Sequence, residues 1–422
     1  MGVRVCIEAR VHPESGGLVQ FIQGLASGLA SLRDGDDEYI FLVDDAHAGL
    51  LEPFVAGAAR LEVVSAHGNS RTLPSRLATS VARPIFHRVS PFFGPGTVSI
   101  PSSPGHAEWL GADVVHFQAG LAYTTAIPSL FQPWDLQYRH FPQFFPRRTR
   151  LVREVRDRVF CARASRVIVA SEFGRNDLVS QLGVDLEKVA IVPIAAATDI
   201  YPEASEDDFA RARRAIDLPP AFLLYPAQTW PHKNHLGLVQ ATALLRESGL
   251  DIPVVCTGRR TDFFQTISAR ARHLGVADLV RFTGFVEPRE LKALYRLCRG
   301  VVFPTLFEGG GLPALEALAA DAALACSACS SLPEVVGDAA ILFDPTSPPD
   351  IARALRIIWC EPDVRAQLIR RGRLRLATMS WESTARATRR LYRAVAAGRQ
   401  VAEWHRDTVN VKAERRSKTH AR

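Results

Sequence analysis

The chain has 422 residues, 47% of them hydrophobic, and a formal net charge of +7 at pH 7. It is too long for one typical core, so we expect two packed domains. The basic balance favours anionic ligands or an anionic membrane surface. It does not favour nucleic acid, because no interleaved aromatic stripe accompanies the basic residues.

The first half alternates between strand-like and helix-like runs. Apolar strands are predicted at residues 3–9, 39–43, 61–64, 113–117 and 166–170. An amphipathic helix is predicted at 17–32, entered through Ser15-Gly16-Gly17, and Ser171 is the expected N-cap of a later helix. Strands that alternate with helices indicate a parallel, doubly wound sheet.

A second alternating series follows a predicted inter-domain linker at 195–208. Its strands are predicted at 222–225, 254–257, 280–283 and 301–303, with helices between them and a long helix at 381–401. We therefore predict two Rossmann-like domains that face a central cleft. Ligands of such sheets bind at the carboxyl ends of the strands. The polar or glycine residues that follow strands are Gly16, Lys233, Thr257, Gly284 and Glu308, which predicts one shared site.

Two segments depart from this pattern. Residues 65–104 combine phenylalanines with arginines, among them Arg71, Arg76, Arg83 and Arg88. This segment is interpreted either as a surface excursion with its own small core or as an acceptor-facing or membrane-facing surface. The tail from 405 to 422 is polar, basic and unpatterned, and we expect it to be disordered.

The sequence offers no metal site. The seven cysteines are scattered, and Cys326 and Cys329 form a lone C-x-x-C with no second pair or suitable histidines. The acidic runs 34–37 and 44–45 are interpreted as surface turns and not as metal-binding motifs. No apolar run approaches the roughly 18 residues of a membrane span, and the N-terminus leads directly into a strand. We expect a cytoplasmic protein without metal or cofactor.

The most informative stretch is a glycine-rich turn between a buried strand and a helix. It runs from Glu308 to Glu316, with Pro313 at the favoured first helical position. Backbone N–H groups and the positive end of the helix dipole suit a diphosphate there. The two carboxylates can then hold hydroxyl groups on either side of that anion. A sugar nucleotide has this composition.

This stretch resembles the signature of the retaining GT-B glycosyltransferases of family four, a Glu, seven residues and a second Glu. The resemblance covers roughly residues 3 to 400. The other matching pieces are Ser15-Gly16-Gly17, 170–173, 188–193, His232-Lys233-Asn234, 282–286 and 332–337. It implies an acceptor domain at 1–198, a nucleotide-sugar domain at 199–379, a helix at 380–402 that crosses back to the first domain, and a basic tail at 403–422.

The resemblance also assigns roles to residues of the cleft. Glu308 is expected to contact the donor sugar, Glu316 the ribose hydroxyls, and Lys233 the departing diphosphate. The remaining donor-binding candidates are Gly16, Gly17, His232, Thr257, Gly258, Arg259, Gly284, Phe285, Val286, Gly310, Gly311 and Leu312. Many relatives have an Arg five residues before the lysine, where this chain has Gln228. We therefore expect His232, Arg259 or another cation to supply the second charge.

The segment from Gln132 to Pro142 resembles the family's P-H-D-L-Q-H-x-H-x-P. Trp134 and Tyr138 replace two of its histidines, whereas Asp135 and His140 remain as candidate catalytic residues. Trp134 can form a flat wall for a sugar ring on the acceptor side or simply pack.

Two functions remain open at this stage. The first is a retaining, metal-independent glycosyltransferase that moves a hexose from a GDP-mannose-like or UDP-sugar donor to a hydroxyl. The acceptor is expected to be a saccharide, a lipid-linked saccharide or a natural product, and a lipid-linked one would place the protein at the inner face of the plasma membrane. The alternative is a catalytically impaired binding or scaffold protein on the same fold, supported only by Trp134 and Gln228.

Overall fold

The computed structural model describes residues 2–12, 16–64, 100–201, 203–216 and 218–398. Most of the segment predicted as a surface or membrane-facing excursion, and the whole of the basic tail, lie outside these residues. Within the described residues, no helix is both long and apolar enough to cross a membrane.

The first sheet contains seven parallel strands in the order β3-β2-β1-β4-β5-β6-β7. Their bounds are β1 Arg4–Glu8, β2 Glu38–Val43, β3 Ala59–Val63, β4 Val114–Gln118, β5 Ser129–Gln132, β6 Arg166–Val169 and β7 Val189–Ile191. The central strands β1 and β4 are almost entirely buried because helices cover the sheet on both sides. The helices that follow these strands include α1 Gly17–Ser31, α3 His106–Trp109, α4 Gln137–His140, α5 Arg147–Arg163 and α6 Glu172–Leu182.

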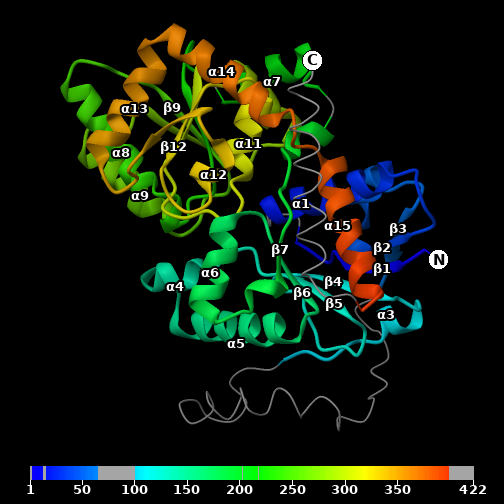
Figure 1. Cartoon of the computed structure of the whole chain (residues 1–422). Coiled ribbons are helices and arrows are strands. Elements are labelled where there is room, and N and C mark those ends of the chain that lie inside the picture. Colours follow the sequence, from blue (N-terminus) through cyan, green and yellow to red (C-terminus); the bar gives the residue numbers. More distant parts are fainter. Residues whose placement is uncertain (1, 13–15, 65–99, 202, 217, 399–422) are drawn as a thin grey trace, which may run out of the picture.

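The second sheet contains six parallel strands in the order β10-β9-β8-β11-β12-β13. Their bounds are β8 Leu223–Pro226, β9 Val254–Thr257, β10 Val280–Gly284, β11 Gly300–Phe303, β12 Leu324–Ser327 and β13 Ala340–Phe343. Its helices are α7 Glu206–Ile216, α8 His235–Glu247, α9 Phe264–His273, α10 Pro288–Leu297, α11 Leu312–Ala319, α12 Leu332–Val336, α13 Pro348–Cys360 and α14 Pro362–Leu376. The predicted class, two doubly wound α/β units, is confirmed (Figure 1).

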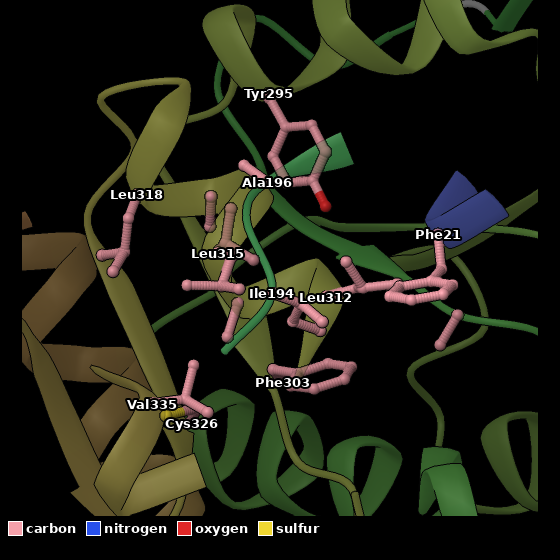
Figure 2. Close-up of a cluster of buried hydrophobic side chains, with 14 of the residues drawn as sticks. Phe21, Ile194, Ala196, Tyr295, Phe303, Leu312, Leu315, Leu318, Cys326 and Val335 are labelled. Carbon is pink, nitrogen blue, oxygen red and sulfur yellow. The ribbon is translucent and has the colours of Figure 1, made fainter. Parts of the chain in front are cut away.

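One apolar core runs from the first sheet into the second. It includes Phe21 of α1, Ile194 after β7, Phe303 of β11 and Leu312 of α11. Figure 2 shows Phe21 and Leu312 facing each other where the two units meet. The start of α1 therefore lies against the start of α11, which are the two helix N-termini expected to border the ligand.

The last helix, α15 (Trp381–Ala396), packs along α1 (Figure 1). Two glycines of α1 make this approach possible, because a Cβ on Gly24 would lie 2.1 Å from the Trp381 ring and one on Gly28 2.3 Å from the Trp381 carbonyl oxygen. The Trp381 indole N–H donates to the Ala196 carbonyl at 2.8 Å. Helix α15 is thereby anchored both to the first unit and to the segment that joins the two.

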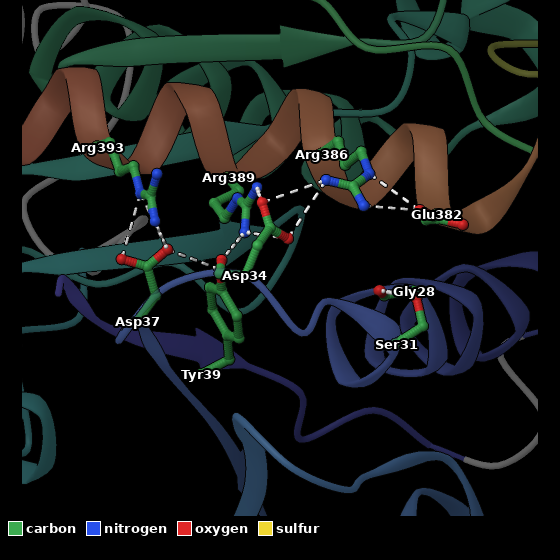
Figure 3. A network of polar contacts seen from close by, with 9 residues as sticks. All are labelled: Gly28, Ser31, Asp34, Asp37, Tyr39, Glu382, Arg386, Arg389 and Arg393. Carbon is green, nitrogen blue, oxygen red and sulfur yellow. Dashed lines mark hydrogen bonds and ion pairs between the residues drawn. The ribbon is translucent and has the colours of Figure 1, made fainter.

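Helix α15 packs on the acidic run at 34–37, which lies at the surface as predicted, with Asp34 and Asp36 exposed and only Asp37 buried. Arg389 pairs with Asp34 at 2.8 Å and Arg393 with Asp37 at 2.9 Å, as Figure 3 shows. Asp37 is only 7% exposed and also accepts a hydrogen bond from the Val3 amide. Arginines spaced along one face of α15 hold these carboxylates in place, and sequence reading could not reveal partners some 350 residues away.

Candidate active site

The glycine-rich turn between β11 and α11 lies tightly against the first unit. Gly311 has a positive φ of 66°, which favours glycine, and it precedes α11 without a side-chain cap. A Cβ on Gly309 would lie 2.5 Å from the Trp134 carbonyl oxygen, and one on Gly310 would lie 2.8 Å from Ile194. Gly309 is therefore required by a close backbone approach and Gly311 by its positive φ.

Lys233 and Glu308 form an ion pair in the cleft. Lys233 ends the short 3-10 turn Pro231–Lys233 after β8, and Glu308 follows β11, the neighbouring strand. Their side chains are 18% and 11% exposed, and the Lys233 ammonium also lies 5.4 Å from the Phe303 ring centre. The structure thus brings together the two residues that the sequence placed at strand ends.

Two serines that the sequence reading missed hold the backbone of Glu308. Its amide donates to the Ser330 hydroxyl at 2.8 Å, and the Ser331 hydroxyl donates to its carbonyl at 2.9 Å. Ser330 itself has a positive φ of 47°. The only signal for this role was their position just before the matching piece at 332–337.

Glu316 is buried, with 2% of its surface exposed, and both of its carboxylate oxygens have partners. The Tyr295 hydroxyl donates to Oε2 at 2.8 Å, and the Gln20 amide group donates to Oε1 at 2.9 Å. Burial raises the pKa of Glu316 from 4.5 to about 7. Gln20 belongs to the other unit, and no sequence pattern pointed to it.

The Gly16–Gly17 entry to α1 lies against the second unit. A Cβ on Gly17 would be 3.3 Å from the Leu312 side chain, and one on Gly16 would be 3.5 Å from the Gln228 amide nitrogen. Gly16 has φ 57° and ψ −119°, a conformation suited to glycine. The loop therefore covers the start of α11, where a diphosphate is expected.

The loops after β8, β9 and β10 form the other wall. Gly258 has a φ of 106°, and a Cβ there would lie 2.7 Å from the Ala227 backbone. Thr257 is buried at the end of β9, and the Arg259 carbonyl accepts from the Thr229 amide at 3.2 Å. Phe285 is 63% exposed beside Gly284.

His232 does not supply the second positive charge in this state. Burial lowers the pKa of its imidazole to about 2, so the ring is neutral at pH 7. The Gln228 side-chain carbonyl accepts from the Trp230 indole at 2.9 Å. Among the residues named from the sequence, Arg259 is the remaining candidate for the second positive charge.

The segment from Trp134 to His140 faces the turn that carries Glu308. Trp134 has a φ of 71°, and its ring packs edge-on against Phe21 with centres 4.5 Å apart. Asp135 accepts from the Gln137 amide at 3.0 Å. His140 directs Nε2 to Asp177 Oδ1 at 2.8 Å and packs its ring on Phe307.

A small pocket lies between these elements. Its walls include Trp134, Asp135 and Asp177 from the first unit and Phe307 and Gly309 from the second. On the adjoining edge, the Glu334 carboxylate accepts from the Glu172 and Phe173 amides at 2.8 and 3.2 Å. A carboxylate of α12 thus caps α6 across the cleft.

Four of the seven cysteines are buried in the core, namely Cys6, Cys161, Cys256 and Cys326. All seven are free, and burial raises the pKa of Cys329 to about 11, which leaves the thiol protonated and unreactive at neutral pH. In the part of the chain that the structure describes, no three His, Cys, Asp or Glu side chains are grouped to hold a metal ion.

Comparison with known proteins shows which family the chain resembles. Residues 206–375 match the model for glycosyl transferases group 1. The chain is 27% identical over 234 residues to the O-antigen chain mannosyltransferase B of Escherichia coli, which covers 54% of this chain and 61% of that protein. It is 28% identical over 243 residues to the D-inositol 3-phosphate glycosyltransferase of Streptomyces avermitilis, covering 55% and 52%. These matches span between half and two thirds of the relatives' own lengths.

Solved structures share the whole architecture. The sucrose-phosphate synthase of Thermosynechococcus elongatus superposes with a TM-score of 0.68 at 17% identity, over 94% of this chain and 100% of the other. Anabaena HepE, in complex with UDP and glucose, gives 0.67 at 14% identity, over 93% and 100%. At these identities the likeness establishes the fold alone, which is GT-B. The match of residues 206–375 and this shared fold support a group 1 glycosyltransferase.

Proposed function

We propose that the protein transfers a hexose from a nucleotide-sugar donor to a hydroxyl group of a saccharide, lipid-linked or natural-product acceptor, with retention at the anomeric carbon. The observation that carries this proposal is the Lys233–Glu308 ion pair beside the N-terminus of α11, with buried Glu316 within that helix. A cation, a helix N-terminus and two carboxylates match the diphosphate and the hydroxyl groups of such a donor.

The chemistry begins with departure of the nucleoside diphosphate. The bond from the anomeric carbon to the phosphate oxygen breaks with its electrons on that oxygen, and positive charge develops on the sugar. Lys233 and the amides around Gly311 and Leu312 stabilise the negative charge. The acceptor oxygen then bonds to the anomeric carbon on the face that the diphosphate left, and the departing phosphate takes the acceptor proton. This scheme needs no metal ion.

Glu308 has a distinct part in this scheme. Its carboxylate pairs with Lys233, and the next residue, Gly309, lies against the Trp134 carbonyl. From there it can accept hydrogen bonds from donor-sugar hydroxyls and stabilise the developing positive charge. Asp135 and His140 are the candidates to orient the acceptor, with Trp134 as a wall for a sugar ring.

Two classes of nucleotide-sugar donor are candidates. The similarity to mannosyltransferases favours a GDP-mannose-like donor, whereas HepE was solved with UDP. A thermal-shift screen with GDP-, UDP- and dTDP-sugars tests this directly, because a ligand that binds only the native state raises the melting temperature. A rise with one nucleotide family supports the proposal, and no rise with any of them contradicts it.

A second candidate is a binding or scaffold protein that no longer turns over. Its support is Gln228, whose side-chain carbonyl is engaged by Trp230 where many relatives have an arginine. Such a protein would bind the nucleotide sugar but release neither nucleoside diphosphate nor transferred sugar. Measuring both products separates the two functions.

The site of action follows from the acceptor. A lipid-linked acceptor would require contact with the inner face of the plasma membrane, whereas a soluble acceptor would leave the protein in the cytoplasm. The arginines from Arg71 to Arg88 lie outside the described residues, so this contact rests on sequence composition alone.

A further inference from the structure

The carboxylate expected to bind ribose is closed off by the opposite domain. Gln20, in the first turn of α1, donates to Glu316 Oε1 across the interface at 2.9 Å. Tyr295 occupies the other oxygen at 2.8 Å. Because Glu316 is only 2% exposed, a ligand cannot contact its carboxylate while Gln20 is hydrogen-bonded to Oε1.

The two partners of Glu316 differ in their freedom to move. Tyr295 lies on α10, in the same unit as Glu316. Its hydroxyl also donates to the Pro313 carbonyl at 3.3 Å. Gln20 lies in the other unit, directly after the Gly16–Gly17 loop. Opening of the cleft therefore separates Gln20 from Glu316 and leaves the Tyr295 contact intact.

A buried carboxylate needs a donor whether or not a ligand is present, because an unpaired one carries the full cost of its lost hydration. The Gln20 amide group is a neutral donor at ordinary hydrogen-bond distance. A ribose hydroxyl is also a neutral donor that can approach a carboxylate at such a distance. The two groups can therefore exchange at Oε1 without changing the charge of the site.

We propose that Gln20 is a placeholder for a ribose hydroxyl: its amide group donates to Glu316 when no nucleotide is bound and must be displaced when a nucleotide binds. This inference rests on the proposed function, since it assigns the ribose to Glu316. It makes Gln20 a positioning residue that lowers the affinity for nucleotide by stabilising the empty closed form. The affinity a ligand shows is reduced by the fraction of protein held in a form that cannot bind it.

The test is the affinity of Gln20→Ala for GDP, UDP and dTDP, measured by calorimetry on the whole chain. We expect the nucleotide that binds the wild type to bind the variant about 3- to 10-fold more tightly, the factor that one net hydrogen bond provides. Gln23→Ala is the matched control, because that carboxamide lies on the same helix but bonds to the Leu50 carbonyl at 2.9 Å and to the Tyr201 hydroxyl at 2.6 Å. Its nucleotide affinity should equal that of the wild type.

A double-mutant cycle checks that the effect passes through Glu316. In a Glu316→Gln background the change Gln20→Ala should alter nucleotide affinity by less than about 2-fold, because the contact is already altered. If a nucleotide binds the wild type and Gln20→Ala leaves its affinity unchanged or weakens it, the placeholder role is wrong while the proposed function stands. If none of the three nucleotides binds either protein, both fail together.

Discussion

Lys233 and Glu308 face each other from the ends of two neighbouring strands, β8 and β11, and form an ion pair in the cleft. The two opposite charges balance each other. We expect that Lys233 can exchange its carboxylate partner for a phosphate oxygen of a diphosphate, which frees Glu308 for the sugar.

Replacing Lys233 should remove the main stabilisation of the leaving group. We expect Lys233→Ala to lower kcat by roughly 10²-fold or more, the scale of losing one oriented stabilising group. Lys188→Ala is a matched control, because Lys188 lies at the amino end of β7 and donates to the Ala162 carbonyl at 2.6 Å. Steady-state kinetics with both variants decides the point, and near wild-type turnover in Lys233→Ala would reject the role.

Replacing Glu308 and replacing Glu316 should impair the protein in different ways. Glu316→Gln should weaken binding of the bare nucleoside diphosphate, because the ribose contact does not depend on the sugar. Glu308→Gln should mainly lower kcat, because its partner is the transferred sugar. Calorimetry with the nucleoside diphosphate, beside kinetics with the full donor, measures both effects. Equal losses of nucleotide affinity in the two variants would contradict the assignment.

Glu316 should also make stability depend on pH. Burial raises its pKa from 4.5 to about 7, so the native state holds a proton that the unfolded chain releases between these values. The contribution of Glu316 to the free energy of unfolding is therefore present below about pH 4.5 and is lost as pH rises through about 7. The loss is on the order of 3 kcal/mol.

Urea denaturation of the wild type and Glu316→Gln from pH 4.5 to 8 measures this change. Burial raises the pKa of both Tyr295 and Tyr201, so neither phenol titrates in this window. The stability of the wild type relative to the variant should fall across the range. A difference that is constant, or that grows with pH, would show that Glu316 is not a buried carboxyl with a raised pKa.

Ser330 should act on turnover through the backbone of Glu308. The change Ser330→Ala removes the acceptor of the Glu308 amide, a hydrogen bond of 2.8 Å, and loosens the placement of the carboxylate. We expect kcat to fall about 10-fold, with little change in affinity for the bare nucleotide. Ser330→Asn, which keeps a side-chain oxygen that can accept and tolerates the positive φ, should recover part of the activity. An equal loss in both variants would indicate a packing role instead.

The fold class was predictable because apolar strands alternate with amphipathic helices along most of the chain. The prediction gave no range for β5, β7, β12 or β13, and β12 follows α11 so closely that the apolar residues 314–326 show no clear boundary. The location of Lys233 and Glu308 at strand ends was also predictable. Parallel topology brings such ends to one edge of the sheet.

The contacts across the interface were not predictable from one sequence. Gln20 and Glu316 are 296 positions apart, and neither periodicity nor a motif links them. The same holds for Asp37 and Arg393, which are 356 positions apart: their pair holds the one buried carboxylate of a run that is otherwise at the surface. His232 was a candidate cation because Gln228 replaces the arginine of many relatives, whereas in the fold desolvation lowers the pKa of its imidazole to about 2.

The most direct test of the account is transfer of a labelled sugar. The wild type is incubated with each labelled GDP-, UDP- and dTDP-sugar, a saccharide or lipid-linked acceptor mixture and EDTA, with Glu308→Gln in parallel. We predict that one donor yields nucleoside diphosphate and an equal amount of labelled product that keeps the anomeric configuration, and that the variant loses most of this activity. Binding of a donor without release of either product, or activity that appears only when Mn²⁺ or Mg²⁺ is restored, would contradict the account.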